Sequence, residues 1–135
     1  GVSLAGKQGE QVLEKKMAEF QQQNSTIYSQ ALNSARDVKR KADLTALATT
    51  MNVYMMENDG VPVDFPDEPK CIGTDSGCYN LYNLIVPDYI EKQYLDDTHG
   101  TSGNSGYKIG KSHDGITSFV AQGTSETGEV LEVRK

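Results

Sequence analysis

The feature that most constrains the fold is one apolar stripe at helical spacing that ends at a sharp stop. Its members recur three or four residues apart, as one face of an α-helix requires. They are Leu44, Leu47, Ala48, Met51, Tyr54 and Met55. Gly60 is a natural helix stop, and Val61 favours extended conformations because Pro62 follows it. The sequence therefore predicts a helix that ends near Asn58 and buries one face.

The helical period also occurs upstream of this stripe. Residues 8–23 predict helix, with Leu13, Met17 and Phe20 at i, i+4 and i+7. Residues 24–26, Asn-Ser-Thr, either cap a new helix or lie on the wet face of a continuous one. The same three apolar residues also raise the alternative of a coiled-coil dimer, for which the stripe is short and irregular.

The middle of the chain predicts mostly loop. Residues 61–78 are rich in proline and acidic side chains, which leave no room for a periodic element. Residues 79–86 place Leu81, Leu84 and Ile85 on one side of a short helix. Pro87 stops that helix because proline lacks the N–H that the helix interior needs. Small polar residues at 96–106 then predict an exposed loop.

The final third has the period of β-strands. Short stretches of strand pattern occur at about 107–111, 116–121 and 129–133. Asp114-Gly115 between the first two is a hairpin signal, because type I′ turns need positive φ at both central residues. The sequence thus predicts an α+β fold, with a long N-terminal α-helix packed on a small antiparallel β-sheet of about three strands and a variable loop region between them.

Charge argues against one broad class of function. The chain of 135 residues has a formal net charge of −6, whereas a nucleic-acid surface needs clustered Lys and Arg, so no nucleic-acid partner is expected. One dense group of charges lies on the predicted helix: Arg36, Asp37, Lys39, Arg40 and Lys41. Side chains four residues apart neutralise this group locally, which predicts a solvated helix face. The predicted pairs are Asp37 with Lys41 and Lys39 with Asp43.

The cysteines predict a disulfide. Cys71 and Cys78 enclose a short, glycine-containing loop that is flexible enough to close. For so short a loop, the chain-entropy model gives about 2.5 kcal/mol of stabilisation. A disulfide in turn points to an oxidising, extracytoplasmic setting. The alternative is a metal site with His99 and His113, which lacks the tight Cys-x-x-Cys spacing of such sites.

Catalytic strings do not occur in the sequence. There is no Gly-x-Ser-x-Gly, phosphate loop or His-Glu-x-x-His, and both histidines fall in loop or turn contexts. We therefore expect that the protein is not an enzyme. No run of apolar residues is long enough to span a bilayer.

Three strings, in this order, resemble type IV pilin-like proteins, the group that includes pilus subunits and the pseudopilins of type II secretion systems. They are "ALNSARDVKRKADLTALATTMNVYMMENDGVPV" at 31–63, "LYNLIVPDYIEK" at 81–92 and "GYKIGKSHDGITSFVAQGTSETGEV" at 106–130. The likeness covers about 29–133. It implies a head domain at 29–135 and an N-terminal helical extension at 1–28, which is either native helix or a fused segment.

The resemblance implies a structural subunit of a bacterial type IV pilus or related filament, which assembles with other copies and other pilins through its N-terminal helix. The charged group at 36–41 would then pair with charges on adjacent subunits. The alternatives are a minor pilin that acts as an adhesion module and a pseudopilin of a type II secretion system. The implied location is a cell-surface filament, with anchoring in the inner membrane before assembly.

The sequence also departs from the family pattern. The family's N-terminal Phe, the Glu five residues in and the apolar membrane anchor do not occur in this sequence. Some pseudopilins bind calcium in the loop before the sheet, and here Asp96 and Asp97 are the candidate ligands. Their acidic pattern is incomplete for calcium, and solvated loop carboxylates are the other interpretation. No other cofactor is expected.

Overall fold

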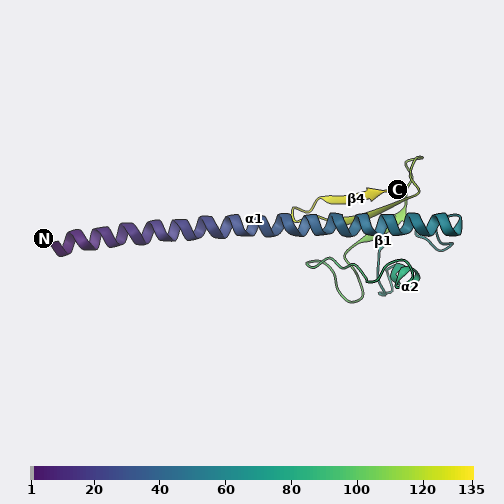
Figure 1. The fold of residues 1–135 in the computed structure, drawn as a ribbon, viewed down its shortest axis with the longest axis horizontal. Coiled ribbons are helices and arrows are strands. Elements are labelled where there is room, and N and C mark those ends of the chain that lie inside the picture. The colour runs from purple at the N-terminus through teal and green to yellow at the C-terminus, as the bar shows by residue number, and fades with distance from the viewer. Residues whose placement is uncertain (1) are drawn as a thin grey trace. The chain divides into compact units, whose positions relative to one another are not determined.

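The computed structural model describes residues 2–135, with side chains from residue 9 onward. A long helix and a four-stranded antiparallel sheet make an α+β fold, which confirms the predicted class (Figure 1). The elements in chain order are α1 (Val2–Asn58), β1 (Lys70–Cys71), α2 (Leu81–Ile85), β2 (Lys108–Lys111), β3 (Phe119–Thr124) and β4 (Val130–Arg134).

Helix α1 is continuous across residues 24–26, so the second of the two alternatives for this segment is correct. Thr26 donates its hydroxyl to the Gln22 carbonyl at 3.0 Å, a bond within the helix that needs no cap. The predicted stop is confirmed. The backbone turns to positive φ at Asp59 and Gly60, and the Gly60 N–H donates to the Met55 carbonyl at 3.0 Å.

The chain divides into two compact units, Gly1–Ala35 and Arg36–Lys135. This boundary lies further along the chain than the one expected after residue 28. The described side chains of the first unit, residues 9–35, are exposed. The second unit contains the rest of α1, the sheet, α2 and the hydrophobic core.

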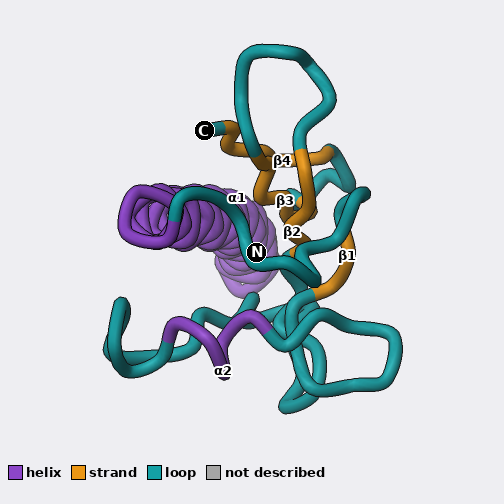
Figure 2. The backbone as a smooth tube through the Cα atoms, turned by 90° about the vertical axis from the view of Figure 1, so that its right-hand side faces the viewer, coloured by secondary structure: helices purple, strands orange, loops and turns teal. Residues whose placement is uncertain are grey.

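The core of the second unit lies between α1, the sheet and α2. Figure 2 shows the strands beside one side of α1 and α2 beside another. Leu44, Leu47, Ala48 and Met51 are fully buried, which confirms the predicted stripe. Their buried apolar neighbours come from α2, β2, β3 and the connecting segments: Phe65, Ile72, Leu81, Tyr82, Ile85, Tyr107, Ile109, Phe119 and Ala121. Tyr54 and Met55, at the end of the stripe, are only partly buried.

The sheet has the order β1-β2-β3-β4, with each neighbouring pair antiparallel. The expected hairpin joins β2 to β3, but its turn is not the expected type I′, because Gly115 has φ of 76° while Asp114 has no positive φ. Residues 116–118, however, belong to the turn. Asp114 accepts the N–H groups of Ile116 and Thr117 at 2.9 and 2.7 Å, so these residues turn instead of pairing.

Two further expectations need correction. Residues 61–78 are not all loop, because Lys70 and Cys71 pair with β2 and make a fourth strand. The short helix is narrower than 79–86, since α2 spans Leu81–Ile85. It does end before Pro87, as expected.

Gly110 in β2 lies against the segment that precedes β1. A Cβ built there would lie 2.5 Å from the Glu68 carbonyl carbon and 2.6 Å from the Pro69 nitrogen, both backbone atoms. We expect Gly110→Ala to lower the free energy of unfolding by about 2 kcal/mol, because the backbone of one strand must shift. Urea unfolding followed by circular dichroism measures this loss.

Gly77→Ala is the matched control for Gly110→Ala. Nothing lies within 4 Å of a Cβ at position 77, and its φ is not in the left-handed region. Its stability should equal that of the parent protein or exceed it slightly. Equal losses in the two variants would contradict the close approach at Gly110.

Candidate functional site

The charged group on α1 contains a buried arginine. Arg40 is only 2% exposed. Its Nε donates to Asp96 Oδ2 at 2.8 Å, and its Nη2 donates to Asp96 Oδ1 at 3.3 Å and to the Thr98 hydroxyl at 3.1 Å. Its Nη1 donates to Asp37 Oδ1 at 2.8 Å. The expectation of a solvated helix face is therefore wrong for Arg40.

Asp96, the partner of Arg40, is buried as well. Its Oδ1 accepts the backbone N–H groups of Thr98 and His99 at 2.9 and 3.1 Å, and its Oδ2 lies 3.1 Å from His99 Nδ1. Its side chain has no exposed surface. The expectation of a solvated carboxylate in an exposed loop is therefore wrong at this position.

The structure does not bring Asp96 and Asp97 together as calcium ligands. The Asp96 oxygens are occupied by Arg40 and by their own loop, whereas Asp97 is exposed, 3.6 Å from Lys39 Nζ. Among the residues that the structure describes, no three His, Cys, Asp or Glu side chains are grouped so that they could hold a metal ion.

The environment of Asp96 favours its charged form. Burial alone raises the pKa of this carboxyl, but hydrogen bonds from Arg40, Thr98 and His99 outweigh burial and hold the pKa well below the ordinary value of 3.8. The hydrogen bond to Asp96 likewise raises the pKa of Arg40 above its ordinary value of 12.5, against the effect of burial. Both groups are thus charged across the physiological range.

A second arm of the cluster ties α1 to the turn between β3 and β4. The Glu126 N–H donates to Asp37 Oδ1 at 3.0 Å, and Arg36 Nε donates to Glu126 Oε1. Arg40 Nη1 also lies 3.6 Å from Glu126 Oε2. Asp37 therefore pairs with Arg40 three residues on, while Lys41, its expected partner, is exposed.

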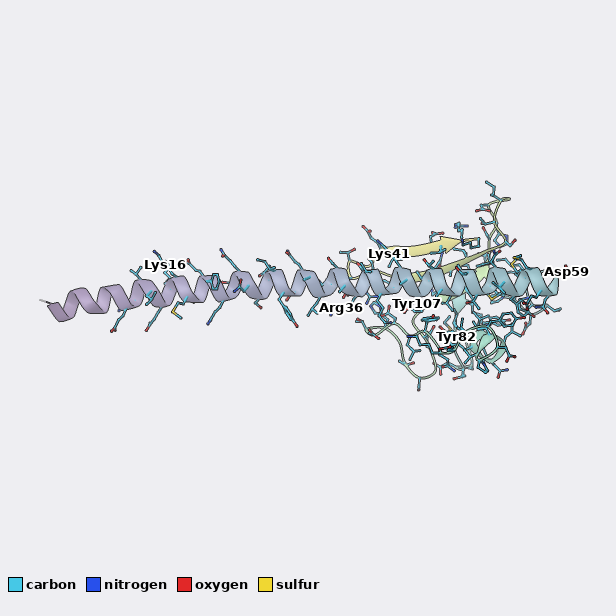
Figure 3. The ribbon with its side chains drawn as sticks, viewed as in Figure 1. Lys16, Arg36, Lys41, Asp59, Tyr82 and Tyr107 are labelled. Carbon is cyan, nitrogen blue, oxygen red and sulfur yellow. A yellow bond between two sulfur atoms is a disulfide. The ribbon has the colours of Figure 1, made fainter. Side chains whose placement is uncertain are left out.

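A third arm joins α1 to the residue before β2. Lys39 Nζ donates to Asp43 Oδ2 at 2.9 Å, which confirms that predicted pair, and to the Leu95 carbonyl at 2.9 Å. Tyr107 donates its hydroxyl to the same Asp43 oxygen at 2.7 Å. Burial, and then this hydrogen bond, raise the pKa of Tyr107. Figure 3 labels Tyr107 beside this part of α1.

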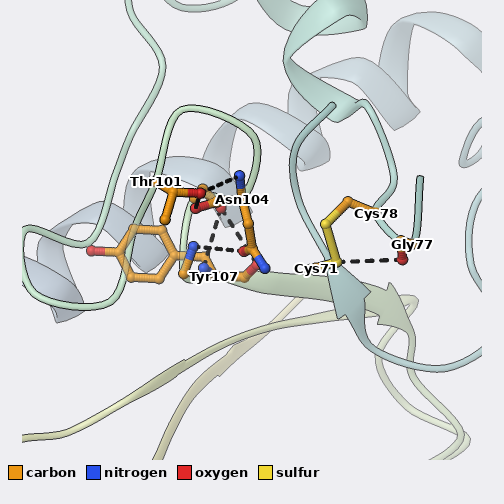
Figure 4. The surroundings of a disulfide bond; sticks show 8 residues. Cys71, Gly77, Cys78, Thr101, Asn104 and Tyr107 are labelled. Atoms are coloured by element: carbon orange, nitrogen blue, oxygen red, sulfur yellow. Dashed lines mark hydrogen bonds between the residues drawn. A yellow bond between two sulfur atoms is a disulfide. The ribbon is translucent and has the colours of Figure 1, made fainter. Parts of the chain in front are cut away.

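Cys71 and Cys78 form the predicted disulfide (Figure 4). Both sulfurs are used, so the alternative metal site with His99 and His113 is wrong. The disulfide loop contacts residues 101–104: the Asp75 N–H donates to the Gly103 carbonyl at 3.0 Å. The small polar residues at 96–106 therefore pack closely through their backbone.

The first unit carries a different candidate surface, which is apolar. Large side chains between residues 12 and 32 are exposed, most of them by more than half of their surface. They are Val12, Leu13, Met17, Phe20, Ile27, Tyr28 and Leu32. Within the described part of the chain, no helix has both the length and the hydrophobicity needed to cross a membrane.

Comparisons with models of protein families, with curated proteins and with solved structures find no match to this chain. The class of the protein is therefore described from its fold and its two candidate sites. The protein is an α+β protein whose long helix carries a buried, ion-paired arginine and a buried apolar stripe after residue 35 and exposed apolar side chains before it.

Asp96→Asn tests the buried ion pair. The substitution removes the charge that faces Arg40 and leaves a buried guanidinium with weaker partners. We expect the free energy of unfolding to fall by about 3 kcal/mol. Asp97→Asn, at the exposed neighbour, should change it by less than about 0.5 kcal/mol. Urea unfolding of both variants distinguishes the two positions, and similar losses would contradict a special role for Asp96.

Acid provides a separate test of the same carboxyl. Because the pKa of Asp96 is lowered in the folded state, its contribution to stability is complete above the unfolded-state value, near pH 4, and is lost as the pH falls through the folded-state value. The parent protein should therefore lose stability below about pH 4 more steeply than Asp96→Asn. Unfolding free energies at a series of pH values measure the two slopes, and equal slopes would rule out the linkage.

Proposed function

We propose that this protein is a structural subunit of a bacterial type IV pilus or a related pilin-like filament, and that it assembles through α1. The observation that carries the proposal is the change of surface along this helix. Leu44, Leu47 and Met51 are fully buried in the second unit, whereas the large apolar side chains between residues 12 and 32 are exposed. Exposed apolar surface of this extent is typical of an interaction site.

The sequence likeness agrees with this proposal at the level of single elements. The string at 31–63 corresponds to the second half of α1 and its stop, the string at 81–92 contains α2, and the string at 106–130 contains β2 and β3. A helix packed on an antiparallel sheet is the arrangement that the resemblance implies. The disulfide agrees with a location outside the cytoplasm.

The other parts of the proposal follow from the same resemblance. The partners are further copies of this chain and other pilins, the location is a cell-surface filament with anchoring in the inner membrane before assembly, and no catalytic role is proposed. Of the charged group at 36–41, Lys41 is the best placed for contacts between subunits, because it is exposed while Arg40 is buried in ion pairs of its own chain.

A minor, adhesive subunit is a second candidate function. One observation favours it: Ile116 is 91% exposed at the tip of the hairpin between β2 and β3. The tip has a defined shape, because Asp114 accepts hydrogen bonds from Ile116 and Thr117. An apolar side chain held in this way is suited to contact a partner.

The complete gene product in its native host tests the filament proposal. Cells are sheared, and the protein is quantified in the filament fraction by mass spectrometry. A filament subunit should be enriched there. Lys41→Glu should lower the filament yield by more than about tenfold, because a reversed charge at a subunit contact costs several kcal/mol. Lys108→Glu, another exposed lysine, is the control and should leave the yield unchanged.

Other outcomes would overturn parts of the proposal. A protein that stays with the membrane while no filaments form is not a filament subunit, and a secretion role would replace the pilus role. A protein that is rare in filaments, combined with loss of attachment in Ile116→Ser while filaments persist, would favour the adhesive subunit. Equal yields for Lys41→Glu and Lys108→Glu would remove Lys41 from the subunit contact.

A further inference from the structure

Four of the exposed large apolar side chains of the first unit, Leu13, Met17, Phe20 and Ile27, fall on one heptad register. With Asn24 and Ala31, the positions of this register are alternately four and three residues apart, while Val12, Tyr28 and Leu32 lie off it. Leu13, Met17 and Phe20 alone make a short, irregular stripe, but α1 is continuous through residues 24–26, so the same spacing extends along the helix to Ile27 and Ala31. The register therefore stays on one face of one helix. Such spacing is typical of a coiled-coil seam.

We propose that residues 13–31 of α1 form a parallel, in-register, two-stranded coiled coil with a second copy of this chain. Leu13, Phe20 and Ile27 take the d positions, and Met17, Asn24 and Ala31 take the a positions. Asn24 identifies the partner as another copy. A single asparagine at an a position lowers stability but specifies register, because it faces its own counterpart across the seam.

The orientation follows from the same residue. In a parallel pair, a positions face a positions, so the Asn24 amide meets the partner's Asn24 and both amides can exchange hydrogen bonds. In an antiparallel pair, a positions face d positions, and every d position of this seam is apolar. The amide would then be buried without a polar partner, which is costly.

The flanks of the seam permit this pairing. In a parallel pair, each g position faces the e position of the partner's next heptad. Lys16 then faces the partner's Gln21, and Gln23 faces the partner's Tyr28, so no like charges meet. Residues 20–35 carry no charged side chain at all. Pairing therefore buries no ionised group over most of the seam.

This inference does not rest on the proposed filament function. Two helices pair whether or not further subunits add, and solution experiments on residues 1–135 need no host cell. If the protein is not enriched in sheared filament fractions, the helix pair can still form in solution. If no pair forms in solution, the filament proposal is still decided by the shearing experiment.

Sedimentation equilibrium of the 135-residue chain over a concentration series is the first experiment. The chain has a mass of 14.8 kDa, and we expect twice this mass at high concentration with dissociation on dilution. The double variant Met17→Gln, Phe20→Gln should weaken the pair by more than about a hundredfold, because both copies lose two apolar seam residues. Glutamine is a good helix former, so α1 itself tolerates the change.

The matched control is the double variant Val12→Gln, Leu32→Gln. Both residues are exposed and apolar on the same helix but lie outside the seam, so this variant should remain a pair. A monomer at every concentration of the parent chain, a larger assembly than two, or an equal loss in the control variant would each overturn the proposal.

Cross-linking then tests the orientation. Leu13→Cys should form a disulfide-linked pair on mild oxidation, because the two positions face each other near one end of a parallel, in-register seam. Val12→Cys, one residue away and off the seam, should cross-link far more slowly. If the Leu13→Cys variant fails to cross-link while sedimentation still shows that it forms a pair, the parallel arrangement is overturned.

Discussion

The buried ion pair between Arg40 and Asp96 is the interaction on which the second unit depends. The two residues are fifty-six positions apart in the sequence, and both side chains are withdrawn from water. A buried charge without a partner costs far more than a surface ion pair gains. The loop that carries Asp96 therefore has to lie against α1, and the hydrogen bonds from Thr98 and His99 set the shape of that loop around the carboxylate.

The constraint extends from this loop into the sheet. The Asp96 N–H donates to the Ser105 carbonyl at 2.8 Å, the Ser105 N–H to the Ile72 carbonyl at 2.8 Å, and the Ile72 N–H to the Tyr107 carbonyl at 2.9 Å. Ile72 directly follows β1 and the disulfide residue Cys71. A polar segment without apolar side chains thus joins α1 to the sheet edge through its backbone, which explains why glycine and serine suffice there.

The spacing of residues close together in the sequence was enough to predict the elements that form from local interactions. The apolar stripe, its stop near Asn58 and the hairpin at Asp114-Gly115 follow from spacing and turn chemistry. Strand β1 does not, because two residues pair only where β2 offers an edge. Asp96 also carries no local signal, since its partner is remote. Arg40 did carry a local signal, because it lies four residues before Leu44 and seven before Leu47, on the buried stripe itself. Its charge led to the expectation that it is exposed.

The charged and the apolar segments of α1 differ in whether their side chains already have partners within the chain. Most of the charges that the sequence offers between residues 36 and 43 are engaged within the chain: Arg36 and Arg40 with Glu126, Asp37 and Asp96, and Lys39 with Asp43. Between residues 20 and 35 the helix has no charge, and its large apolar side chains are exposed. The proposed association through α1 would therefore draw mainly on apolar burial, while the charged segment serves first to hold the second unit together.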